Sequence, residues 1–204
     1  MEIHPPEKPI HTVRDFLLQL MTITVGILIA LSLESVVEWN HHRNLVSEAK
    51  ENLRQEILAN RKEIHKVVTE VPELRTNEEA GLALIRELLQ HKAKGDRKLN
   101  FSYDLALLSN TSWNTAQAIG AVAYMPYEDV KRYSSIYDYQ QKFNGVQDRL
   151  IQAMITVGPS EDPKNSSPQS LEQWRGRIQT CLAYARTVEE WARALEEEYD
   201  KALK

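Results

Sequence analysis

Histidine is the residue type of this chain best suited to bind a metal ion or to transfer protons near neutral pH. None of its histidines belongs to a His-Glu-x-x-His pair or lies at ligand spacing from a cysteine. Two are adjacent, and in a helix their side chains would point about 100° apart, which prevents them from sharing an ion within one chain. The sequence therefore predicts no metal site and no cofactor. The histidines are His4, His11, His41, His42, His65 and His91.

Motifs for covalent or phosphoryl chemistry are also missing from the sequence. There is no Gly-x-Ser-x-Gly turn and no glycine-rich phosphate loop, and the two facing Glu-x-x-His copies of di-iron bundles are not found. The only cysteine, Cys181, lies in an apolar helical repeat that is typical of a small buried hydrophobe. We expect a protein that is not an enzyme, although an active site built from scattered residues would escape this reasoning.

An aromatic cluster is the most unusual local composition. In one interpretation its tyrosine hydroxyls orient a small ligand in a pocket. In the other, which we favour, the rings fill the core and its rim at helical spacing while their hydroxyls reach water. The residues are Trp113, Tyr124, Tyr127, Tyr133 and Tyr137, with Tyr139 close by.

The element that organises the chain is an apolar stretch from Phe16 to Val37. It is long enough as a helix to cross the ~30 Å hydrocarbon core of a bilayer, so we predict an irregular tail over 1–12 and a transmembrane helix over 13–38. Thr12 is the expected N-cap of this helix. Two alternatives remain open at this point: a signal peptide cleaved near Ala30-Leu31-Ser32, and a buried core helix of a soluble protein.

Small residues recur at every fourth position within this predicted span, at Thr22, Gly26 and Ala30. They lie on one helix face, where a second helix could approach closely. Trp39 and Arg43 follow the span directly, as expected of side chains that anchor a helix at the lipid headgroups.

The charges that flank the span do not decide its orientation, because Lys8 and Arg14 precede it while Arg43, Lys50 and Arg54 follow it. A short tail before the span and a long domain after it is the layout of a signal anchor. We therefore expect a single-pass protein of the inner membrane with a periplasmic domain.

The remaining residues, 39–204, predict one helical domain. We expect the membrane helix to continue until Pro72 ends or kinks it, and a second helix to run to about Lys94. A brief helix is predicted over 101–108, then a small-residue helix capped by Ser112, and a long helix opened by Pro126. A flexible loop over 158–168 precedes a last helix that starts near Pro168 or Ser170.

That last helix carries an apolar seam at spacings of three and four residues, which is typical of coiled-coil-like packing. The seam consists of Leu171, Trp174, Ile178, Cys181, Ala185, Val188, Trp191, Leu195, Tyr199 and Ala202. The predicted fold is all-α, with an N-terminal transmembrane helix that continues into an antiparallel helical bundle.

Two stretches, TITVGILIALSLESVVEWNHHR and the later TSW...AIGAV...YEDV..YSSIYDYQ, resemble an uncharacterised family of bacterial single-pass membrane proteins with a helical soluble domain. The resemblance implies bacterial origin and membrane anchoring, and it carries over no functional residue.

The 204-residue chain has a net charge of -4, and its acidic and basic residues are interleaved, which argues against nucleic acid as a partner. We expect a protein that is anchored in a lipid membrane and has no enzymatic activity. Its expected function is to associate with itself or to bind another envelope protein. The alternative is a periplasmic sensory bundle that binds a small ligand near the Tyr-rich segment.

Overall fold

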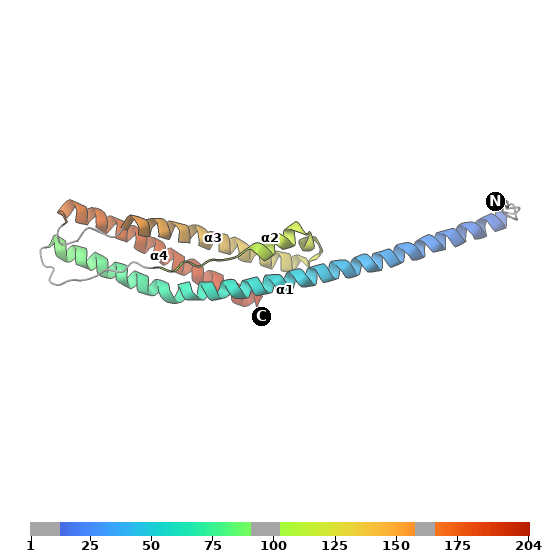
Figure 1. Cartoon of the computed structure of the whole chain (residues 1–204), viewed down its shortest axis with the longest axis horizontal. Helices are drawn as coiled ribbons and strands as arrows, with labels where there is room; N and C mark the ends of the chain where they lie inside the picture. Colours follow the sequence, from blue (N-terminus) through green and yellow to red (C-terminus); the bar gives the residue numbers. More distant parts are fainter. Residues whose placement is uncertain (1–12, 91–102, 158–165) are drawn as a thin grey trace, which may run out of the picture. The chain divides into compact units, whose positions relative to one another are not determined.

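The computed structural model describes residues 13–90, 103–157 and 166–204. The predicted tail 1–12, with the Thr12 cap, and most of the predicted loop 158–168 lie outside these residues. Within them the elements are α1 (Val13–Leu89), α2 (Thr111–Ala118), the 3-10 helix η1 (Ala121–Tyr124), α3 (Tyr127–Val157) and α4 (Pro168–Ala202), and no strand occurs (Figure 1). The predicted all-α fold class is confirmed.

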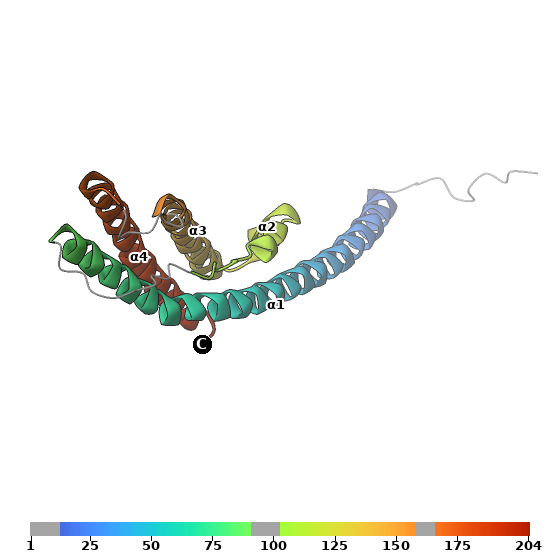
Figure 2. The same ribbon diagram turned by 60° about the vertical axis from the view of Figure 1, so that its left-hand side comes forward.

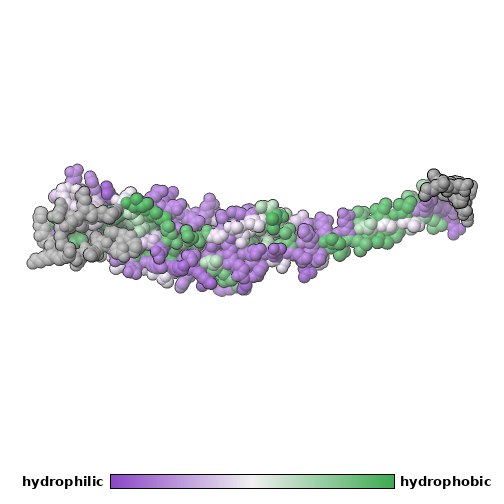
Figure 3. All heavy atoms as spheres, in the orientation of Figure 1, coloured by the Kyte–Doolittle hydropathy of each residue, from purple (hydrophilic) through white to green (hydrophobic). Residues whose placement is uncertain are grey.

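The chain divides into two compact units, Met1–Glu48 and Ala49–Lys204, and α1 begins in the first and ends in the second. Every described residue from Val13 to His41 is exposed. Figure 3 shows apolar side chains over this part of α1. The described residues thus contain one helix that is long and apolar enough to cross a membrane, and none of its most apolar window is buried. The alternative of a buried core helix does not fit this exposure.

Pro72 does not end α1, contrary to the prediction of two separate helices. The helix continues from Val13 to Leu89 with Pro72 inside it, and buried Val71 and Leu74 flank the proline. The Thr76 hydroxyl donates to the Pro72 carbonyl oxygen at 2.9 Å. This bond to the carbonyl four residues earlier is common for threonine within a continuous helix. Packing of the flanking side chains outweighs the cost of one missing backbone donor, which amounts to about 3 kcal/mol in a helix interior.

The second unit contains three long helices: the second half of α1, α3 and α4. Side-chain pairs fix their directions. Along α1 from Arg61 to Glu79 the ion-pair partners on α4 fall from Asp200 to Arg186, so these two helices run antiparallel. On α3, Tyr137 contacts Glu56 and Gln140 contacts Asn60, so α3 runs parallel to this part of α1. Figure 2 shows the same three helices from a second direction.

One hydrophobic core joins the three helices. Its largest fully buried apolar members include Ile64 on α1, Phe143 and Leu150 on α3, and Ile178 and Leu195 on α4. Burial of each such side chain contributes about 1.5–3 kcal/mol. Most of the predicted α4 seam is buried here, while Trp174, Trp191 and Ala202 are partly buried against the core.

The segment before α2 differs from the prediction. Residues 103–110 have no regular secondary structure, so the brief helix expected over 101–108 is wrong for its described part. Asn110, not Ser112, is the N-cap residue of α2. Gly120 adopts φ 76°, a left-handed conformation that suits glycine, and it separates α2 from η1 within the predicted small-residue helix.

The helices α3 and α4 begin where the sequence predicted, at residues that favour a helix start. Pro126 directly precedes α3, and Pro168 is the first residue of α4. The Ser167 hydroxyl caps α4 by accepting a hydrogen bond from the backbone N–H of Ser170 at 3.1 Å.

Candidate functional site

The small-residue face of the apolar half of α1 is fully open in the structure. Thr22, Gly26 and Ala30 are exposed, and a Cβ added at Gly26 would have no atom within 4 Å apart from its neighbours and the backbone of its own helix. The Thr22 hydroxyl donates to the Leu18 carbonyl oxygen at 2.9 Å. This face therefore offers close backbone approach to another helix without leaving a hydroxyl unpaired.

The other three serine and threonine hydroxyls between Phe16 and Val37 are satisfied in the same way. Thr24, Ser32 and Ser35 each donate to the carbonyl oxygen four residues earlier, at 2.7–2.9 Å. In hydrocarbon a hydroxyl finds no water partner, and this internal bond removes most of the cost of burying it in lipid.

Trp39 and Arg43 lie together just after the apolar stretch. The Arg43 guanidinium carbon stands 5.6 Å from the centroid of the Trp39 ring, a cation–π distance. Trp39 is exposed, and the rings of His41 and His42 lie 6.0 Å apart. An indole and a guanidinium at this position suit a lipid headgroup layer.

The predicted aromatic cluster comes together only in part. Trp113 on α2 stacks on Tyr137 of α3, with ring centroids 5.5 Å apart, and lies 6.4 Å from Tyr133. Tyr124 and Tyr127 are exposed, at 51% and 75%. The three inner rings thus pack α2 against α3.

Glu56 of α1 is the centre of a polar cluster that the sequence analysis did not find. The side chain is buried, and its carboxylate accepts from the Tyr137 hydroxyl at 2.6 Å, the Ser109 hydroxyl at 2.7 Å and the Ser112 N–H at 2.8 Å. Burial, followed by the hydrogen bond to Glu56, raises the pKa of the Tyr137 hydroxyl, so that hydroxyl stays protonated and donates. Glu56 therefore caps the first turn of α2 from another helix.

Two buried amides extend this cluster. Asn60 donates to the Ser109 carbonyl oxygen at 2.7 Å and accepts from the Ser109 N–H at 2.9 Å. Gln140 donates to the same carbonyl oxygen at 2.9 Å and accepts from the Tyr199 hydroxyl at 2.9 Å. The backbone of Ser109 is thereby held by α1 and α3 together.

Gln147 repeats the arrangement further along α3. Its amide accepts from the Ala106 N–H at 3.0 Å and donates to the Ala106 carbonyl oxygen at 3.1 Å, and the Tyr103 hydroxyl donates to it at 2.8 Å. Backbone groups of the segment 103–110 therefore pair with side chains in place of a strand or helix partner. A polar residue at core spacing, such as Asn60 among apolar neighbours, was the only signal of this network in the sequence.

Glu78 of α1 is the one residue of the described chain with a fully buried carboxyl group that accepts no hydrogen bond. Burial raises its pKa from the ordinary 4.5 to about 7, and the nearby Cys181 thiol and Arg75 only partly offset this effect. Burial also raises the pKa of the Cys181 thiol. Within the described residues no three histidine, cysteine, aspartate or glutamate side chains form a group that could hold a metal ion.

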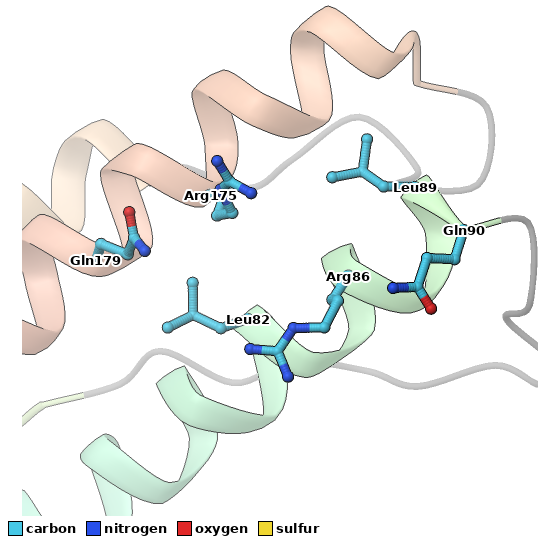
Figure 4. A pocket seen from close by; sticks show the side chains of 6 residues that line it. All are labelled: Leu82, Arg86, Leu89, Gln90, Arg175 and Gln179. Carbon is cyan, nitrogen blue, oxygen red and sulfur yellow. The ribbon is translucent and has the colours of Figure 1, made fainter.

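A pocket of about 310 Å³ lies between the last turns of α1 and the first half of α4 (Figure 4). It is far along α1 from Glu56, and none of the predicted aromatic cluster lines it. Its lining residues are Leu82, Arg86, Leu89 and Gln90 of α1 and its end, with Arg175 and Gln179 of α4.

Comparisons of the chain with protein-family models, with curated proteins and with solved structures give no match. Over the residues that the structure describes, the fold and these sites define an all-α protein with one candidate membrane-spanning helix.

Proposed function

We propose that this is a single-pass protein of the bacterial inner membrane, without enzymatic activity, whose helical domain associates with a second copy of the chain or with another envelope protein. The observation that carries the proposal is the exposure of the apolar half of α1. Large apolar side chains there, including Phe16, Leu20 and Ile27, are 48–55% exposed. Keeping apolar surface in water costs about 25 cal/mol per Å², and lipid removes that cost.

The hydroxyl bonds within this half support insertion into lipid. Each of the four serine and threonine hydroxyls between Phe16 and Val37 already has a carbonyl partner in its own helix. The pairing of Arg43 with Trp39 supports a headgroup layer at the C-terminal end of the span. The domain lies on the periplasmic side in this proposal, the side that a signal anchor predicts.

Self-association is proposed to use the face of Thr22, Gly26 and Ala30. Helices in lipid gain no hydrophobic free energy by pairing, so close van der Waals contact at small residues is what favours the pair. The open space around Gly26 is compatible with such contact.

The test compares two substitutions that add the same side chain on opposite faces. Gly26→Ile places a branched side chain on the small face, whereas Thr24→Ile places it about 160° away. Energy transfer between labelled full-length chains in lipid bilayers measures the dimer. We expect Gly26→Ile to weaken association about tenfold and Thr24→Ile to leave it unchanged.

Equal effects of the two substitutions would contradict the proposed face. A chain that stays monomeric at every protein-to-lipid ratio would contradict self-association. If crosslinking of that monomer in intact cells also gave no product with a second protein, the proposed function as a whole would fail.

A further inference from the structure

The interface between α1 and α4 contains a regular series of ion pairs. Arg61 pairs with Asp200, His65 with Glu196 at 2.7 Å, Arg75 with Glu189 at 2.6 Å, and Glu79 with Arg186 at 3.5 Å. In each pair a basic side chain of one helix meets a carboxylate of the other. The four pairs run antiparallel over about five turns of helix, with a register shift of four residues between the first pair, Arg61 with Asp200, and the last, Glu79 with Arg186.

The register of the last pair, Glu79 with Arg186, extends into the pocket. The offset that sets Glu79 against Arg186 brings Gln179 opposite Arg86, and Gln90 opposite Arg175. All four of these residues line the pocket. Arg86 and Arg175 therefore each have a neutral amide across the interface. The basic residues at the earlier positions of the series have a carboxylate there.

Among the described residues, neither arginine has its charge matched across the pocket. Arg86 forms no ion pair among the described residues, and none of the six lining residues is acidic. Arg175 pairs with Glu172 of its own helix at 2.6 Å but remains 47% exposed. A guanidinium has five N–H donors, so this one pair leaves donors for another anion.

Leu82 and Leu89 form the apolar part of the same pocket (Figure 4). Both are partly buried and pack against the hydrophobic core. The pocket thus combines two cationic groups, two amides and an apolar wall in about 310 Å³, a volume at the small end of ligand sites.

We propose that this pocket binds a small amphiphilic anion, a phosphate or carboxylate group that carries a short apolar chain. Arg86 and Arg175 bind the anionic group from opposite helices, since guanidinium groups match the oxygen geometry of both anions. Leu82 and Leu89 contact the apolar chain, and the amides of Gln90 and Gln179 add neutral hydrogen bonds. The anion supplies the negative charge that the ion-pair series lacks at these two positions.

A competing explanation assigns Arg86 only to the helix dipole, because it lies in the last turn of α1, where a cation stabilises the partial negative charge of the helix end. That role requires no ligand. The two explanations differ in what a titration with an anion will show.

The experiment is calorimetric titration of hexyl phosphate into the full chain in phosphatidylcholine nanodiscs, with empty discs as the blank. We expect hexyl phosphate to bind more tightly than inorganic phosphate, and hexylammonium to give no binding. Arg86→Gln and Arg175→Gln should each weaken hexyl phosphate about tenfold. Arg54→Gln, an exposed change on α1 outside the pocket, should leave the affinity unchanged.

A second variant supplies the missing charge from the protein itself. Gln179→Glu places a carboxylate opposite Arg86, and we expect it to compete with hexyl phosphate and to lower its affinity about tenfold. The matched control is Gln173→Glu, the same change at an exposed position of α4 that does not line the pocket. Binding that is unaffected by Gln179→Glu would overturn the proposal.

Two further outcomes would also overturn it: no heat of binding for the wild-type chain, or equal binding by wild type and Arg86→Gln. The source of the anion follows from competition with a short-chain phosphatidylglycerol that dissolves in water, because the pocket lies about 66 Å along α1 from the end of the predicted span and lipid of the disc does not reach it. Competition by this lipid assigns the site to a lipid headgroup, and undiminished binding assigns it to a soluble anion.

Discussion

The two halves of α1 belong to one helix but differ in what surrounds them. In the first half, between Phe16 and Val37, apolar side chains are exposed on every face of the helix. In the half from Ala49 to Leu89, burial recurs every three or four residues, as at Leu53, Ile57 and Ile64, and polar side chains lie between.

This difference follows from the sequence pattern of each half. An apolar stripe of period 3.6 is satisfied by packing against one side of a protein core, which leaves the other side for water. A helix that is apolar on all sides needs an apolar surrounding on all sides, and a core of three helices does not supply that to this half.

Matched substitutions in the two halves give the largest expected effect. Ile57 is 1% exposed and Ile27 is 55% exposed. We expect Ile57→Ala to lower the free energy of unfolding of the helical domain by about 2–5 kcal/mol, because it leaves a cavity in the core. Ile27→Ala should change it by less than about 0.5 kcal/mol. Denaturant unfolding of the full chain in nanodiscs measures both, and equal losses would contradict the distinction between the halves.

The polar cluster around Glu56 should give an intermediate effect. Glu56→Ala leaves the Tyr137 hydroxyl, the Ser109 hydroxyl and the Ser112 N–H without their acceptor. We expect a loss of about 3 kcal/mol in the free energy of unfolding. The control is Glu51→Ala on the exposed side of α1, where the carboxylate only accepts from Gln55. An equally small loss for Glu56→Ala would show that the cluster does not hold the segment 103–112.

The smallest effect depends on pH. The pKa of Glu78 is about 7 in the folded chain against an ordinary 4.5, so between these values the folded state binds more protons than the unfolded state. The contribution of Glu78 to stability is therefore fully present below pH 4.5 and is lost as the pH rises through 7. Glu78→Gln removes this dependence and should stabilise the domain by about 1–3 kcal/mol at pH 8 relative to wild type.

The measurement for Glu78 is the denaturant midpoint at pH 5 and at pH 8. The exposed neighbour Glu79 provides the control, since Glu79→Gln should leave the difference between the two pH values as it is in wild type. A wild-type midpoint that does not fall between pH 5 and pH 8 would contradict the burial of an unpaired carboxyl group at Glu78.

Periodicity predicted the long helices well. The α4 seam, from Leu171 to Tyr199, was predicted because each of its apolar residues faces the same core. The apolar half of α1 was predicted for a simpler reason. Its uninterrupted apolar composition and its length are those of a helix that crosses lipid.

The non-periodic parts were predicted poorly because partners distant in sequence determine them. Segment 103–110 has apolar spacing that resembles a helix, yet Asn60, Gln140 and Gln147 bind its backbone and replace the helical hydrogen bonds. Pro72 was predicted to end or kink α1 from its local cost, whereas tertiary packing on both sides keeps the helix continuous. The pocket depends on the register between α1 and α4, which no single stretch of sequence contains.

The central proposal is that the apolar part of α1, from Phe16 to Val37, lies in lipid and that the helical domain lies on the periplasmic side. The most direct measurement is the rate at which a membrane-impermeant maleimide labels Val25→Cys and Glu51→Cys in intact bacterial cells with a permeable outer membrane. The native Cys181 is buried, and burial raises the pKa of its thiol, so it gives little background. We expect rapid labelling of Glu51→Cys and no labelling of Val25→Cys until the membrane is dissolved. Labelling of Val25→Cys as fast as Glu51→Cys, or of Glu51→Cys only after the inner membrane is broken, would contradict the account.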